Sequence, residues 1–186
     1  MSVMPLYNII ALPGAKLWLQ TRIYKELTGK TPVEGGRVTL LMQKGEQPRA
    51  GLDGDSFRPI GVTGAISEVS ANGFVCVDIQ NRVNIEEVAV LRDRSFSMTV
   101  SRRADVDDLD PADAARRLTG VKDRILSFAR GKQWEGMLRG FAAHWDSLWT
   151  VAAAMSPWLS APAEERYALL AEDSLSARFD ALEQML

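Results

Sequence analysis

The pattern of apolar and polar positions changes character near the middle of the chain. Over residues 1–104 the apolar residues come in short runs, separated by turns that are rich in glycine and proline. Over residues 105–186 they recur instead every three or four positions, which is the spacing of one face of an α-helix. This change of period predicts two domains, a β-rich one over 1–104 and a helical one over 105–186.

The first part reads as a series of short strands with no long helix between them. Its apolar runs cover residues 3–10, 15–20, 37–43, 60–69, 74–85 and 88–100, and the last could be one strand or two with a kink. The sequence Asn72-Gly73 lies between two of these runs and is a strong signal for a β-hairpin. Short strands in succession favour a barrel or a folded sandwich over an α/β sheet.

The second part carries start signals and apolar faces of helices. Asp110 before Pro111 is a good cap for a first helix. Apolar residues then continue at helical spacing over 134–155, which predicts one long amphipathic helix. Asp173 is the expected cap of a last helix, which has neither glycine nor proline behind it and is therefore expected to continue. The whole pattern predicts an α+β protein, in which a barrel or folded sandwich of strands is followed by helices.

Composition and charge place the chain among ordinary soluble globular proteins. Hydrophobic residues make up 46% and charged residues 25%, and the net charge is −2. Residues 1–104 hold 13 Lys and Arg against 10 Asp and Glu, whereas residues 105–186 hold 9 against 14. The acidic balance argues against nucleic acid as a partner. The N-terminal residues do not have the pattern of a leader peptide, and no apolar run is long enough to predict a membrane span. Cys76 is the single cysteine and is expected to be buried, so the sequence favours the cytoplasm.

No constellation of residues with catalytic or ligand-binding spacing is visible. His144 is the only histidine, and neither a second metal ligand nor a nucleophile turn accompanies it. The sequence Gly29-Lys30-Thr31 resembles the end of a phosphate-binding loop, but Tyr24 stands where such a loop needs its first glycine. We therefore expect no catalytic residue, no cofactor and no metal in this chain.

Five tryptophans are the remaining candidates for function. Trp134, Trp145 and Trp149 fall within the expected long helix and are interpreted as packing residues. Trp18 and Trp158 fall in less regular segments, where an exposed aromatic side chain can anchor a partner. Structural packing is the alternative for these two as well.

The order of several segments resembles the N-terminal domain of Lon-type ATP-dependent proteases. The resemblance rests on Met4-Pro5-Leu6-Tyr7-Asn8-Ile9-Ile10-Ala11-Leu12-Pro13-Gly14, Leu40-Leu41-Met42-Gln43-Lys44, Ile60-Gly61-Val62-Thr63-Gly64-Ala65-Ile66, Asn72-Gly73 and Asp173-Ser174-Leu175-Ser176-Ala177-Arg178-Phe179. Trp18 departs from it where the family usually has proline, and so does the segment 28–36, which is rich in glycine and proline.

The resemblance implies a β pseudo-barrel followed by a helical bundle, which together form a non-catalytic, PUA-like domain of a bacterial, cytoplasmic protease. Such a domain recognises unfolded or damaged polypeptides and aids assembly of the hexamer with other Lon subunits. ATP, Mg²⁺ and the serine peptidase are expected only in downstream domains. Two alternatives stay open: a stand-alone Lon-domain adaptor without a protease, and a PUA-like RNA-binding module. The acidic balance, and the lack of an arginine and lysine stripe interleaved with aromatics, argue against the RNA-binding module.

Overall fold

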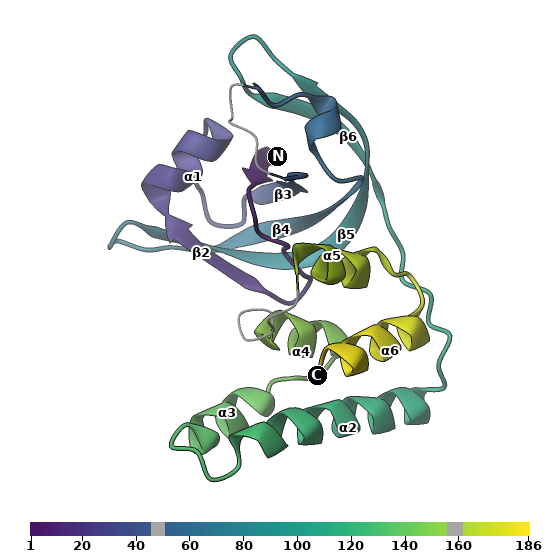
Figure 1. The fold of residues 1–186 in the computed structure, drawn as a ribbon. Coiled ribbons are helices and arrows are strands. Elements are labelled where there is room, and N and C mark those ends of the chain that lie inside the picture. The colour runs from purple at the N-terminus through teal and green to yellow at the C-terminus, as the bar shows by residue number, and fades with distance from the viewer. Residues whose placement is uncertain (46–50, 156–161) are drawn as a thin grey trace. The chain divides into compact units, whose positions relative to one another are not determined.

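The computed structural model describes residues 1–45, 51–155 and 162–186. The chain forms two compact units, Met1–Arg103 and Ala104–Leu186. The first unit carries a mixed β-sheet with a short helix, and the second carries helices (Figure 1). The α+β class that the sequence predicted is confirmed. Its predicted domain boundary lay between residues 104 and 105.

The sheet has six strands among the described residues, in the order β1-β3-β4-β5-β2, with β6 paired to the second half of β5. The strands are β1 (Ser2–Leu6), β2 (Lys16–Gln20), β3 (Arg37–Met42), β4 (Ile60–Val69), β5 (Phe74–Val90) and β6 (Phe96–Arg102). β1 runs parallel to β3, and the other pairs are antiparallel. Figure 1 shows how the long β5 bends on its way from β2 to β6, so that one strand joins two parts of the sheet.

Local signals account for most strand ends. The β4–β5 hairpin turns at Asn72-Gly73 as predicted, and Gly73 takes a φ of 83°. The apolar run 88–100 is two strands, with a turn in which Arg94 has a φ of 64°. The predicted strand 3–10 was too long, because it ends at Leu6. Asn8 has a φ of 55°, which a β-ladder cannot continue through.

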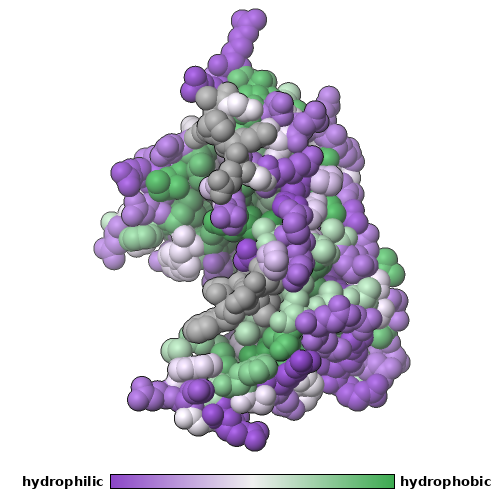
Figure 2. Space-filling model, in the orientation of Figure 1, coloured by the Kyte–Doolittle hydropathy of each residue, from purple (hydrophilic) through white to green (hydrophobic). Residues whose placement is uncertain are grey.

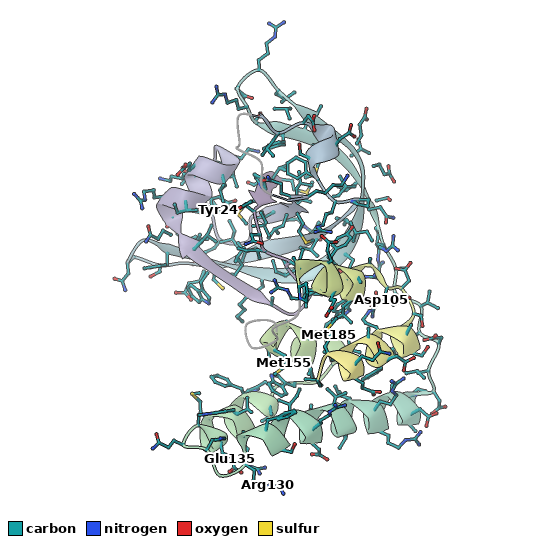
Figure 3. The ribbon with its side chains drawn as sticks, in the orientation of Figure 1. Tyr24, Asp105, Arg130, Glu135, Met155 and Met185 are labelled. Atoms are coloured by element: carbon teal, nitrogen blue, oxygen red, sulfur yellow. The ribbon has the colours of Figure 1, made fainter. Side chains whose placement is uncertain are left out.

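Strand register sorts the side chains of the sheet onto two faces, because residues paired across strands point the same way. The first face carries the larger core, in which Met4, Val38, Leu40, Val62 and Val77 are fully buried. Helix α1 (Thr21–Thr28) lies against β1, and its Tyr24 (labelled in Figure 3) is buried. The second face carries a smaller core of Leu41, Leu52 and Phe57, with Val3, Phe96 and Met98 packed against it.

Five helices are described in the second unit. They are α2 (Pro111–Ala129), α3 (Glu135–Ala142), α4 (Leu148–Met155), α5 (Ala163–Ala171) and α6 (Leu175–Met185). The cap at Asp110 is confirmed, since its carboxylate accepts the backbone N–H of Ala112 at 2.8 Å. The predicted cap Asp173 is wrong: Ser174 has the extended backbone of a cap, and its hydroxyl accepts the N–H of Ala177 at 3.1 Å. α2 contacts α3 and α6, and α5 contacts α6.

The single long helix predicted over 134–155 is wrong. α3 ends at Ala142, and α4 begins at Leu148. Ser147 and Thr150 explain the new start, because the Ser147 hydroxyl accepts the Thr150 N–H at 3.2 Å and the Thr150 hydroxyl accepts the Ser147 N–H at 3.1 Å. This reciprocal cap begins a second helix inside what the apolar spacing presents as one.

The segment that enters the second unit is tied to α4 and α6 by side chains. The guanidinium of Arg178, 1% exposed, forms an ion pair with Asp105 at 3.0 Å and lies 4.2 Å from the ring centroid of Trp149. It also donates to the backbone carbonyls of Glu172 and Asp173 at 2.7 and 3.3 Å. This buried cation therefore joins three segments that are far apart in the sequence. The β pseudo-barrel and the helical bundle that were expected are more specific than this arrangement and stay predictions.

Candidate partner-binding surfaces

Titratable groups in the described residues do not gather into a metal site: no group of three or more His, Cys, Asp or Glu side chains there could hold an ion. His144 is exposed in the turn between α3 and α4. Cys76 is buried, and its Sγ lies 3.7 Å from Oδ1 of Asp78. Burial, and then the charge of Asp78, raise the pKa of the Cys76 thiol, so it stays protonated at neutral pH and is a poor nucleophile. The remaining candidates are exposed apolar surfaces.

Trp18, the first predicted partner-binding residue, is exposed on β2. Leu17 and Leu19 turn inward by the alternation of the strand, which leaves the Trp18 side chain 51% exposed. Gln20 pairs with Phe74 of β5, and Phe74 is 43% exposed on the same side of the sheet. We call Trp18 and Phe74 the β2–β5 surface. Lys16 and Asp78 border it as an ion pair of 3.4 Å.

The other tryptophans divide between packing and exposure. Trp158, the second predicted partner-binding residue, lies outside the described residues. Trp145 is buried and Trp149 packs against Arg178, as expected for packing residues. Trp134 was also expected to pack, but its side chain is exposed. Trp134 directly precedes α3. Because α3 ends at Ala142, the apolar face on which Trp134 was expected to pack does not extend along one long helix.

A second apolar surface lies where α2 meets α3. Met137 and Phe141 of α3 are 55% and 58% exposed, and with Trp134 they follow the spacing of three and four residues that defines one helix face. Phe128, near the end of α2, is exposed as well. We call these four residues the α2–α3 surface. Figure 2 shows apolar side chains gathered over α3 and α4, with hydrophilic ones around the α2–α3 turn.

Glu135 holds the turn that presents this surface. Its carboxylate accepts the backbone N–H of Gly131 at 2.8 Å and two N–H groups of Arg139, at 3.1 and 2.9 Å. These contacts, with that of Gly131 first, lower the pKa of the Glu135 carboxyl. Figure 3 labels Glu135 and Arg130 at this turn. The exposed aromatic residues are therefore carried on a braced turn and a helix.

Large apolar side chains that gather on a surface indicate binding of another macromolecule more often than single exposed ones do. Phe74 and Phe128 were not singled out from the sequence. The position of Phe74 directly after Asn72-Gly73, on the polar side of its strand, is a signal that could have found it. Phe128 has no such signal, because its spacing also fits the buried face of α2.

The comparisons with known proteins concern structure alone, since no family model matches the chain and no curated protein matches it. The N-terminal domain of a Lon protease from the Mycobacterium avium complex superposes with a TM-score of 0.68 at 14% identity, covering 99% of this chain and 96% of that one. A Lon N-terminal domain protein from Xanthomonas campestris gives a TM-score of 0.56 at 20% identity, covering 100% and 95%. The chain has the fold of a Lon N-terminal domain.

The sequence segments that resemble Lon N-terminal domains are mostly core and turn residues of this Lon fold. Met4 and Leu40 are fully buried on neighbouring strands. Gly14 takes a φ of 83° in the turn that precedes β2. At Gly61 an added Cβ would lie 2.7 Å from the carbonyl oxygen of Leu40, so a side chain there would displace β3. These residues account for the shared fold, and neither exposed apolar surface uses them.

No helix in the described part of the chain combines the length and the apolar character needed to cross a membrane.

Proposed function

We propose that this chain is the non-catalytic, substrate-recognising N-terminal domain of a Lon-type ATP-dependent protease. In this proposal the domain binds unfolded or damaged polypeptides through its exposed apolar side chains. The observation that carries it is the α2–α3 surface, where three exposed apolar residues share one face of a braced segment. Unfolded chains display apolar segments that folded proteins bury, so such a surface selects them broadly.

The binding expected of one surface is weak. Fully burying a Phe or Met side chain contributes about 1.5–3 kcal/mol, and part of this is lost to the ordering of the bound polypeptide. Several linked copies would offset weak single-site binding, because the second contact becomes intramolecular. The proposal therefore includes other Lon subunits as partners, with the domain aiding their assembly into a hexamer in the cytoplasm. ATP and Mg²⁺ then belong to domains outside this chain.

The test is binding of the chain to one protein in two states. Fluorescence anisotropy would compare a labelled, reduced and carboxymethylated protein with its native, folded form. The proposal expects measurable affinity for the unfolded form alone. The variant Met137→Ser/Phe141→Ser should weaken that binding at least tenfold, since about 1.4 kcal/mol corresponds to a factor of ten.

Val33→Ser provides the matched control, because Val33 is 67% exposed and belongs to neither surface. This variant should bind like the parent chain. Circular dichroism of each variant checks that folding is intact. Equal affinity for the folded and unfolded forms, or an equal loss in the Val33 control, would refute the proposal. Trp18→Ser tests in the same assay whether the β2–β5 surface contributes.

A further inference from the structure

Strand β2 is one end of the strand order of the sheet, and Figure 1 shows it at the border of the sheet. In an antiparallel pair, every second residue directs both of its backbone groups to the partner strand. The carbonyl of Ala15 accepts a hydrogen bond from β5 at 2.9 Å, and the N–H of Thr21 donates to the residue directly before β5 at 2.8 Å. Odd-numbered residues therefore bond to β5, and the backbone groups of Lys16 and Trp18 point away from it.

The outward backbone groups of Lys16 and Trp18 have no hydrogen-bond partner among the described residues. The opposite end of the sheet is different. There the carbonyl of Leu6 accepts the N–H of Gln43 at 2.9 Å, so Pro5 is the outward residue of β1, and it has no N–H. Helix α1 also lies against β1. Proline and a covering helix are common means of closing an edge strand, and β2 has an open edge by comparison.

The side chains next to this edge leave apolar surface uncovered on both faces of the sheet. On the first face Leu17 and Leu19 are half-buried, whereas the two residues of β5 that pair with them are 0% exposed. On the second face Trp18 is exposed. A further strand beside β2 would bring side chains to both faces, because successive residues of a strand point to opposite sides. Such a strand would cover the two leucines and contact the indole ring.

The edge of β2 identifies its partner by chemistry. Backbone N–H and C=O groups that recur every second residue match the backbone of an extended polypeptide, and this pairing does not depend on the side chains of the partner. The strands of a folded protein are already paired with one another, whereas an unfolded chain has its backbone groups available. An open edge therefore selects unfolded chains of many sequences, with a preference for apolar residues at alternate positions.

We propose that β2 binds an extended segment of an unfolded polypeptide as an additional strand of the sheet. This inference rests on the proposed function, and it adds a second contact that uses the backbone of the substrate. The α2–α3 surface contacts apolar side chains, and β2 contributes hydrogen bonds together with Trp18. A single polypeptide that reaches both would be held more tightly than by either one, because the second contact is intramolecular.

The test compares Trp18→Pro with Trp18→Ala in the whole chain. Both variants remove the indole ring, but only proline removes the outward N–H, and the ladder between β2 and β5 does not use that group. The probe is a labelled peptide of ten residues in which valine alternates with serine, and its binding is followed by fluorescence anisotropy. Trp18→Pro should bind the peptide about fivefold more weakly than Trp18→Ala, the effect of one lost backbone hydrogen bond. Circular dichroism and thermal unfolding check that both variants fold.

Two N-methylated forms of the peptide test the same pairing without changing the protein. One form carries its methyl groups on the backbone nitrogens of the valines, and the other on those of the serines. Alternate residues of a strand direct their N–H groups to opposite sides, so only one form should lose affinity, by about tenfold. Equal affinity of the two forms, or of the two Trp18 variants, would overturn the proposal. A dimer of the parent chain that Trp18→Pro abolishes would overturn it too, because a second copy would then occupy the edge.

The variant Met137→Ser/Phe141→Ser separates this inference from the proposed function. It should bind the valine–serine peptide like the parent chain, because it leaves β2 unchanged. Weaker binding of unfolded protein by this variant, together with equal affinities of the two Trp18 variants, would refute strand addition alone. Equal binding of folded and unfolded protein by the parent chain would refute the proposed function, whichever form of the peptide binds.

Discussion

The two units of this protein keep their shape by different means. In Met1–Arg103 the backbone ladder of the sheet connects the strands, and apolar side chains fill both faces. In Ala104–Leu186 the helices bury apolar side chains as well, and polar side chains connect distant segments beside a single backbone bridge between Val106 and Ser174. Arg178 reaches Asp105, and Asp108 accepts hydrogen bonds from Ser174 and Ser176. Both units bury apolar side chains, but a continuous backbone ladder adds to this in the first unit and individual charged groups add to it in the second.

The elements of the first unit could be predicted from the sequence better than those of the second. Alternation along a strand determines which side chains point to each face of the sheet, so most strands could be predicted from the sequence. In the helical unit, capping decides where a helix begins, and Ser147 began a helix that the apolar spacing did not reveal. The three predictions below test this difference.

The largest effect is expected from Arg178→Ala. The substitution removes the contact with the Trp149 ring, the ion pair to Asp105 and the donors to two backbone carbonyls. We expect a loss of about 3 kcal/mol in the free energy of unfolding of the second unit, because a buried charge network is broken from within. Urea unfolding followed by hydrogen exchange resolves the effect by region.

Arg116→Ala is the control for that variant. Arg116 forms an exposed ion pair with Asp113 at 2.7 Å, and exposed pairs contribute little. Its loss should change the free energy of unfolding by less than about 0.5 kcal/mol. Equal effects of the two variants would mean that the buried position of Arg178 is unimportant, and protection lost first in the sheet would contradict the division into units.

A smaller loss is expected in the sheet from Gly64→Ala. The added Cβ would overlap the carbonyl oxygen of Asp78, on the neighbouring strand β5. We expect about 2 kcal/mol of destabilisation, the usual cost of overpacking. Gly120→Ala is the contrast, since a Cβ there meets no atom within 4 Å and α2 favours alanine. It should stabilise the protein by up to about 1 kcal/mol. Thermal unfolding of both variants measures the difference, and a stabilising Gly64→Ala would show that β4 and β5 can separate freely.

The smallest effect concerns pH and Asp108. The hydroxyls of Ser174 and Ser176, each 2.6 Å away, and the Ser176 N–H hold the pKa of the Asp108 carboxyl well below its usual range. In the unfolded chain this carboxyl takes up its proton near pH 4. The unfolded state therefore binds more protons below that pH, and the stability of the second unit should fall as pH drops below about 4.

Asp108→Asn should flatten this part of the pH dependence. Urea midpoints of the parent and the variant would be compared at neutral pH and in steps below pH 4. Asp107→Asn serves as the control, because Asp107 is exposed and neighbours Asp108 without reaching the two serines. An unchanged pH profile in Asp108→Asn would show that other carboxylates govern the acid response.

The fold was predicted further than the sites were. The hairpin at Asn72-Gly73, the cap at Asp110 and the α+β class follow from short-range rules, and the structure agrees with each. The strand expected over 3–10 ends at Leu6, ahead of the positive φ of Asn8, and the helix expected over 134–155 is interrupted between Ala142 and Leu148. In both places the backbone changes while the apolar pattern continues.

The candidate surfaces were predicted only in part. Trp18 was singled out from the sequence and is exposed, and its binding of a partner stays a prediction. Trp134 was expected to pack and is exposed instead. Arg37 and Arg102 line one shallow hollow of the sheet. Their proximity was not predicted, because only strand pairing brings two positions so far apart in the sequence together.

By itself the sequence determined the alternation of the strands, the turns and the first helix cap, because these depend on neighbours a few residues apart. It also determined that the acidic residues concentrate in the second half. Only the tertiary structure decided which residues share a surface. Register carries positions far apart in the chain to the same face, and burial of Arg178 depends on residues as distant as Asp105. Contacts of that kind arise from the whole fold, since no local pattern specifies the partner.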